Sequence, residues 1–167
     1  MGEEVDKRVM EAADALVGAF DALREAKLAL DDPRLSSSSD QQRNQGFSQA
    51  ANRTESAAKK GEEALRRALV AAAVRRSAAD FACYRLADGR LAGARAEWRS
   101  AAREEDASGK AARLSIAVAL LEQGLDAAKD LIFREAADAE AAANGFDDSA
   151  AMFVRTAQRP PAGQPSG

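Results

Sequence analysis

The 167-residue sequence contains no histidine and a single cysteine, Cys83. Histidine is the commonest general base and the commonest metal ligand in proteins, and a cysteine-based zinc site needs several cysteines. One cysteine also excludes a disulfide within the chain. We therefore predict no catalytic residues, no metal site, no cofactor and no enzymatic activity. Because Phe81 and Tyr84 are neighbours of Cys83, we expect its thiol to be buried and unreactive.

Large apolar residues are also scarce. Leu, Ile, Val and Phe together supply 29 residues, whereas Ala alone supplies 42. So few large side chains would favour disorder if the net charge were high, but the net charge is only -3 and Ala is the strongest helix former. The composition predicts an all-α fold, an Ala-rich antiparallel helical bundle of three long helices and one short helix, with a disordered C-terminal tail.

Long apolar runs are absent as well. The longest, Ala68 to Val74, is too short to cross a bilayer. The first residues are acidic and lack the basic and apolar regions of a signal peptide. These features predict a cytoplasmic protein without a transmembrane segment.

The stretch from Phe47 to Ala87 is predicted to form one long central helix. Small and apolar residues recur there in steps of four and three, as in a helix that packs against other helices. Small side chains allow a partner helix to approach closely, and Gly61 marks either a close crossing or a kink. The predicted seam consists of Phe47, Ala51, Thr54, Ala58, Gly61, Leu65, Ala68 and Ala72.

Other helices are expected to cover this central one. The first spans about residues 3–30 and ends at Pro33, which cannot extend a helix. The polar, Ser-rich stretch 33–46 is predicted to be a flexible loop. A turn at Asp88-Gly89 precedes a short helix over 90–105. A last long helix over 110–143, with Asp106 or Ser108 as its N-cap, carries the clearest stripe of core residues: Leu114, Val118, Leu121, Leu125, Ala128 and Ile132.

The chain thus divides into three segments. Residues 1–145 form the bundle with its loop at 33–46, residues 146–157 form a short amphipathic helix, and residues 158–167, rich in Pro and Gly, form a disordered tail. Trp98 either anchors the short helix to the bundle or binds a partner, and the 146–157 helix either docks on its own bundle or binds a partner. The candidate partner-binding residues are Trp98, Phe146, Met152, Phe153 and Val154.

Charge is unevenly distributed along the chain. Residues 1–32 carry 9 acids and 4 bases, residues 114–148 carry 8 and 2, and residues 33–99 carry 7 and 13. Acidic outer helices around a basic central segment predict a self-complementary bundle, in which charge selects the topology more than it adds stability.

A nucleic-acid surface is not favoured. At about 100° per residue, the central arginines scatter around a helix, and few aromatic residues are available to stack on bases. The arginines in question are Arg66, Arg67, Arg75, Arg76, Arg85 and Arg90.

The segment Tyr84-Arg85-Leu86-Ala87-Asp88 is similar to the Tyr-x-x-x-Asp/Glu pattern that follows a helical hairpin in substrates of mycobacterial-type (type VII) secretion. The Trp-x-Gly turn of that family is absent, and the pattern covers five of the 167 residues. The resemblance implies a secreted helical-hairpin protein of a bacterial secretion system, which we retain as a second alternative function.

The sequence favours a non-catalytic helical interaction protein. Such a protein would be a scaffold, an adaptor or a helical subunit of a larger assembly, and would act through a protein partner or self-association. The first alternative is a peripheral membrane-surface protein, which lays a basic amphipathic helix on lipid. The central helix favours it less, because its apolar side is mostly Ala. A small-molecule carrier needs an internal cavity, which close Ala packing does not favour.

Overall fold

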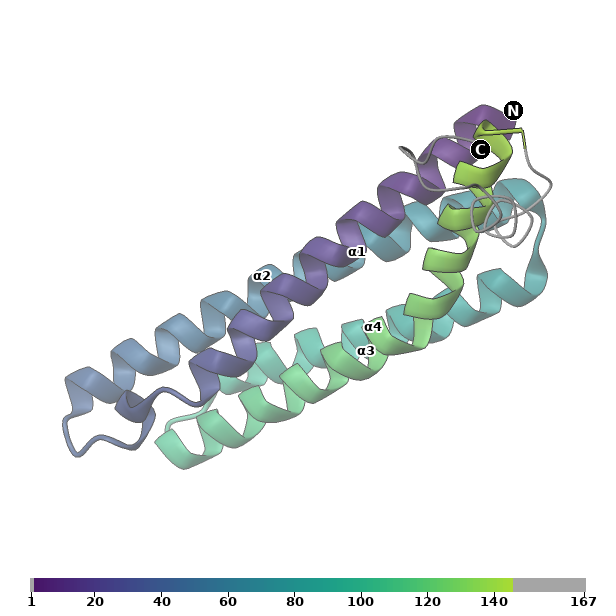
Figure 1. Cartoon of the computed structure of the whole chain (residues 1–167). Coiled ribbons are helices and arrows are strands. Elements are labelled where there is room, and N and C mark those ends of the chain that lie inside the picture. Colours follow the sequence, from purple (N-terminus) through teal and green to yellow (C-terminus); the bar gives the residue numbers. More distant parts are fainter. Residues whose placement is uncertain (1, 146–167) are drawn as a thin grey trace, which may run out of the picture.

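The computed structural model describes residues 2–145, and within this range the chain forms a bundle of four α-helices. Short connections make successive helices antiparallel. The first two helices pair as one hairpin and the last two as a second (Figure 1). The predicted all-α, Ala-rich helical bundle is confirmed. Its elements are α1 (Gly2–Leu30), the 3-10 helix η1 (Pro33–Ser36), α2 (Asp40–Arg75), α3 (Ala78–Arg103) and α4 (Ala107–Ala143).

The two hairpins pack against each other along both sides, α2 against α3 and α4 against α1. In Figure 1 the C-terminal part of α4 turns away from α3 and crosses the end of the bundle towards the start of α1. There Ala136 packs on a small cluster of Val5, Val9 and Ala71. Helices α1, α2 and α4 therefore meet at this end.

The core stripe predicted for the last helix is confirmed. All six of its residues, from Leu114 to Ile132, are buried. The helix begins where Asp106 caps it, since a carboxylate oxygen of Asp106 accepts a hydrogen bond of 2.9 Å from the backbone N–H of Gly109. Such a cap satisfies one of the free donors of the first turn.

The boundaries predicted for the central helix are wrong. It ends at Arg75, where Arg76 adopts a left-handed conformation (φ 56°) and Ser77 caps α3 by accepting a hydrogen bond from the N–H of Asp80. The turn predicted at Asp88-Gly89 lies inside α3. The short helix predicted over 90–105 is therefore the second half of a 26-residue helix, and all four helices are long.

The loop predicted over residues 33–46 is also wrong in extent. Residues 33–36 form η1, held by a hydrogen bond of 2.9 Å from the N–H of Arg34 to the Asp32 carboxylate. Residues 40–46 belong to α2, because Ser39 caps that helix by accepting a hydrogen bond from the N–H of Gln42. A cap allows a polar segment to start a helix.

The small-residue seam of α2 packs as predicted. Its residues from Thr54 to Ala72 are buried, and Gly61 lies at a close crossing without interrupting the helix. A Cβ atom at Gly61 would lie 2.9 Å from Cδ2 of Leu125 and 3.0 Å from Cδ2 of Leu91. One at Gly124 would lie 2.3 Å from Cδ1 of Leu91. The Leu91 side chain of α3 thus sits between a glycine of α2 and a glycine of α4.

Ion pairs connect the acidic first helix to its basic neighbour. Across the α1–α2 contact, Asp6 pairs with Arg75 (2.9 Å), Glu11 with Arg67 (2.8 Å) and Glu25 with Arg53 (2.9 Å). These side chains are partly exposed, and such pairs contribute at most about 1 kcal/mol each. They join the acidic first helix to the basic second one, in keeping with the predicted charge complementarity of these two segments.

Several predictions fall on residues outside the described range. These are the helix over 146–157, the tail over 158–167 and the candidate partner-binding residues Phe146, Met152, Phe153 and Val154. Within residues 2–145, no helix combines the length and the apolarity needed to cross a membrane.

Candidate interaction groove

An elongated depression runs along the junction of α2 and α3. Two neighbouring cavities, of about 220 Å³ and about 580 Å³, share Arg95 and Arg99 in their walls. We call this depression the α2–α3 groove. It is lined by Thr54, Glu55, Ala58, Lys59, Glu62, Arg66, Leu69 and Val70 of α2, by Asp88, Ala92, Ala94, Arg95, Ala96, Trp98 and Arg99 of α3, and by Leu121 of α4.

The sequence explains why the groove is open. Where α2 and α3 face each other, their apolar side chains are mostly alanines, which are too small to fill the space between the two helices. Below them, Leu121 of α4 forms an apolar floor, and on the α2 side Val70 is 39% exposed. An apolar depression of this kind is a common place for a partner side chain to bind.

Trp98 forms part of the wall at one end of the groove. Its indole Nε1 donates a hydrogen bond of 3.1 Å to the backbone carbonyl of Ala51 on α2, which fixes the ring across the junction. Nearby, the ammonium of Lys110 lies 5.1 Å from the centre of the Phe47 ring. Trp98 is half-buried, so it both anchors α3 and forms part of the cavity wall.

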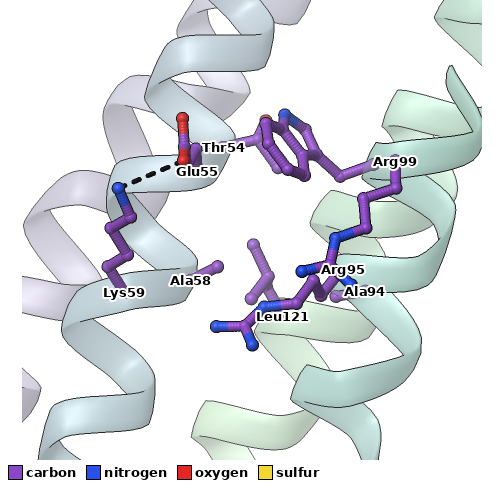
Figure 2. A pocket seen from close by; sticks show the side chains of 9 residues that line it. Thr54, Glu55, Ala58, Lys59, Ala94, Arg95, Arg99 and Leu121 are labelled. Atoms are coloured by element: carbon purple, nitrogen blue, oxygen red, sulfur yellow. Dashed lines mark ion pairs between the residues drawn. The ribbon is translucent and has the colours of Figure 1, made fainter. Parts of the chain in front are cut away.

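Charged side chains surround this apolar lining. Figure 2 shows Arg95 and Arg99 extending from α3 into the opening, with Glu55 and Lys59 on α2 opposite them. Lys59 pairs with Glu55 at 3.1 Å, and Arg95 pairs with Glu62. Arg99 has no ion-pair partner among residues 2–145, so its charge is available to an incoming group.

The charge of the whole face has the same sign as this rim. Helix α2 carries seven basic and four acidic residues, and α3 carries five and three. Helix α1 carries four basic and seven acidic residues, and α4 carries four and six. One side of the bundle, formed by α2 and α3, therefore has a net charge of +5, and the side formed by α1 and α4 has a net charge of -5.

A second polar cluster lies where all four helices meet, and its centre is Glu135 of α4. The residue Glu135 is only 8% exposed, and its Oε2 lies 3.7 Å from Arg75 of α2, which also binds Asp6 of α1. Asp80 and the fully buried Tyr84 of α3 complete the cluster. We call these five residues the Glu135 cluster.

Burial determines the protonation of this cluster. Burial, and then the neighbouring Asp80 carboxylate, raise the pKa of Glu135 to about 7, although Tyr84 and Arg75 act in the opposite direction. Burial, and then the Glu135 carboxylate, raise the pKa of the Tyr84 phenol, which therefore stays protonated. The Tyr84 hydroxyl and Oε1 of Glu135 are buried without a hydrogen-bond partner of normal geometry, so a charged Glu135 is poorly solvated there.

The described residues offer little else for chemistry. In residues 2–145, no three His, Cys, Asp or Glu side chains are grouped so that they could hold a metal ion. The Cys83 thiol is half-buried, not buried as predicted, and its Sγ lies 3.6 Å from the carbonyl oxygen of Ala127. The reason is the earlier start of α3, which places Cys83 beside α4 at the bundle surface.

Of the predicted partner-binding residues, only Trp98 lies in the described range, and the structure places it in the groove. Sequence reasoning missed Arg95, Arg99 and Val70. The spacing of Arg95 and Arg99 by four residues, beside Ala92 and Ala96, was a usable signal, because residues four apart share a helix face. The spacing alone does not show that this face lies opposite α2, because the sequence predicts the turn at Asp88-Gly89 and the structure has it at Arg76-Ser77.

No family model matches this chain, and comparisons with curated proteins and with solved structures find no similar protein. The functional argument therefore rests on the geometry of the α2–α3 groove.

Proposed function

We propose that this chain is a non-catalytic helical interaction protein, a scaffold, an adaptor or a helical subunit of an assembly, which binds a protein partner along the α2–α3 groove. One observation supports this above all others. The groove lies between two helices, has an aromatic residue at one end, and is lined by apolar side chains together with four basic and three acidic ones. Aromatic and Arg side chains are the residues most enriched at the energetic centres of protein interfaces.

The dimensions of the groove suit a helical partner. Its α2 wall extends from Thr54 to Val70, which at about 1.5 Å per residue is roughly 24 Å, or between four and five helical turns. An amphipathic helix that lays one apolar face into such a groove is a recurring mode of recognition. The partner's large side chains would occupy the space that the alanines leave empty.

A membrane surface suits the groove less well. A helix that lies on lipid presents a convex, bulky apolar face beside its basic face, whereas Leu121 lies at the bottom of a depression. Several cations of this side are also paired with acids of their own side, as Arg95 is with Glu62 and Arg66 with Glu63. Co-sedimentation of the protein with anionic vesicles would instead favour the membrane alternative.

The secretion alternative depends on access to Tyr84 and Asp88. Both residues lie inside α3, and Tyr84 is fully buried in the core. A receptor that reads the Tyr84 side chain would first have to unfold this part of the helix. This placement does not favour the alternative, so protein binding through the groove remains the proposal.

Photo-cross-linking in cells tests the proposal. With benzoylphenylalanine in place of Val70, ultraviolet light is expected to link the chain to a protein partner, because this side chain lies in the groove. The same residue in place of Ile116, a similarly exposed position on α4 outside the groove, is the matched control. The Val70 adduct should also be lost when Arg99→Glu is added. Equal adducts from both positions, or adducts that survive Arg99→Glu, would refute binding in the groove.

A further inference from the structure

The outer side of α1 carries three exposed apolar side chains in a row. Met10, Val17 and Leu28 are 42%, 52% and 66% exposed. They follow one another at spacings of seven and eleven residues, which are close to two and three turns of a helix. The three side chains therefore lie in one line, and we call them the α1 stripe.

Acidic residues accompany the α1 stripe. Asp14 and Asp21 lie between Met10 and Leu28 on the same side of the helix, and both are exposed. The acids on the inner side of α1, Asp6 and Glu11, are already paired with α2. Asp14 has no ion-pair partner within the described part of the chain. Asp21 pairs with the exposed Arg24 at 2.5 Å on the same side of the helix, so Asp14 is the acid of this row whose charge is unpaired.

The α1 stripe and the α2–α3 groove are complementary in charge, polarity and length. The stripe combines apolar side chains with exposed acids, whereas the apolar lining of the groove is accompanied by four basic and three acidic residues, of which Arg99 has no ion-pair partner among residues 2–145. From Met10 to Leu28 the stripe spans about 27 Å, against roughly 24 Å for the groove. Within one chain they cannot meet, because α1 is fixed against α2 and α4 with its stripe facing outward.

We infer that the occupant of the groove is α1 of a second copy of this chain. The inference rests on the proposal that the groove binds protein, and it names the partner. A symmetric contact of groove with groove would bring two cationic faces together, which like-charge repulsion opposes. The stripe and the groove are different surfaces of the chain, so a single stripe-on-groove contact is heterologous and leaves one stripe and one groove free. Such contacts build rings or open filaments.

Two surface variants separate the two halves of this contact. The stripe variant carries Val17→Asp and Leu28→Asp, which remove the apolar contacts and would bury carboxylates in the groove. The groove variant carries Arg66→Glu and Arg99→Glu, which place acids opposite the acidic stripe. All four positions are exposed, so folding should be retained, and thermal melting by circular dichroism verifies this. If either double variant unfolds at a lower temperature than wild type, the single variant Leu28→Asp or Arg99→Glu is used in its place.

The expected readout is molar mass from light scattering after size exclusion. Wild-type protein should form species larger than a dimer as its concentration rises, and should return to the 17.6 kDa monomer in high salt, which screens the charges. Each variant alone should be monomeric, with association at least tenfold weaker. An equimolar mixture should stop at about 35 kDa, twice the chain mass, because only one stripe and one groove remain functional. Ile116→Asp on α4 is the control that should assemble like wild type.

Three results would overturn the inference: a wild-type monomer at all concentrations in low salt, unchanged assembly of either variant, or a mixture that fails to form the dimer. A monomeric wild type whose Val70 position still cross-links to a different protein would overturn the second copy as occupant and leave the proposed function standing. A Val70 adduct that joins two copies of this chain would support both.

Discussion

Gly124→Ala is expected to lower the free energy of unfolding by about 1–3 kcal/mol, the usual cost of inserting a methyl group into a packed core. The new Cβ would lie 2.3 Å from Cδ1 of Leu91 and 3.1 Å from the carbonyl oxygen of Ala87. Leu91 cannot turn away freely, because it is fully buried and its other methyl group faces Gly61. Urea denaturation followed by circular dichroism measures the change.

Gly89→Ala provides the matched control. Gly89 also lies inside a helix, but no atom would contact its Cβ within 4 Å. The same substitution there should stabilise the protein by up to about 1 kcal/mol, since Ala forms helix better than Gly. Gly61→Ala should fall between the two. Stabilisation by Gly124→Ala, similar to that by Gly89→Ala, would show that Leu91 does not pack between the two glycines.

Stability is expected to fall by about 2–3 kcal/mol between pH 5 and pH 8 because of Glu135. Its pKa of about 7 in the folded protein lies above the ordinary value of 4.5. Between these values the folded state holds a proton that the unfolded state has lost. The contribution is therefore complete below pH 4.5 and is lost as the pH rises through 7. Chemical denaturation at a series of pH values measures it.

Glu135→Gln should remove most of this slope and raise stability at pH 8, because a neutral amide replaces a buried carboxylate. The groups that face it remain in place: Arg75 from α2, with Asp6 of α1 behind it, and Asp80 and Tyr84 from α3. Glu140→Gln, at an exposed position of the same helix, should leave the slope as it is. A wild-type profile that is flat from pH 5 to pH 8 would contradict the burial of Glu135.

The sequence predicted best where large apolar residues recur at helical spacing. The core residues from Leu114 to Ile132 predicted α4 correctly, because only one face of that helix is apolar enough to enter the core. Prediction failed at the turn between α2 and α3. Ala residues continue across Arg76-Ser77 without a Gly or Pro, so nothing in the pattern marks a break there. The Asp88-Gly89 pair is a common turn signal, yet the core contacts of Ala87 and Leu91 hold it in a helix.

The candidate site was predictable only in part. Trp98 stood out because it is the only Trp in the chain. The groove around it exists because α2 and α3 face each other. This arrangement could not be predicted, because the sequence places the turn between the two helices at the wrong residues. The Glu135 cluster was also hidden, since Asp6, Arg75 and Glu135 are far apart in sequence and meet only where α4 crosses to α1. Contacts of this kind depend on tertiary packing and leave no local pattern.

The central claim is that a partner covers the α2–α3 groove along its length. Trp98 and Val70 lie in the two different cavities that form the groove, so a partner cross-linked at one should shield the other. In protein labelled with 5-fluorotryptophan, Trp98 gives a single fluorine resonance, and its relaxation by a soluble gadolinium chelate reports its exposure. We expect strong relaxation in dilute protein at high salt and much weaker relaxation in the purified Val70 adduct. Equal relaxation in both would mean that the bound partner does not lie in the groove.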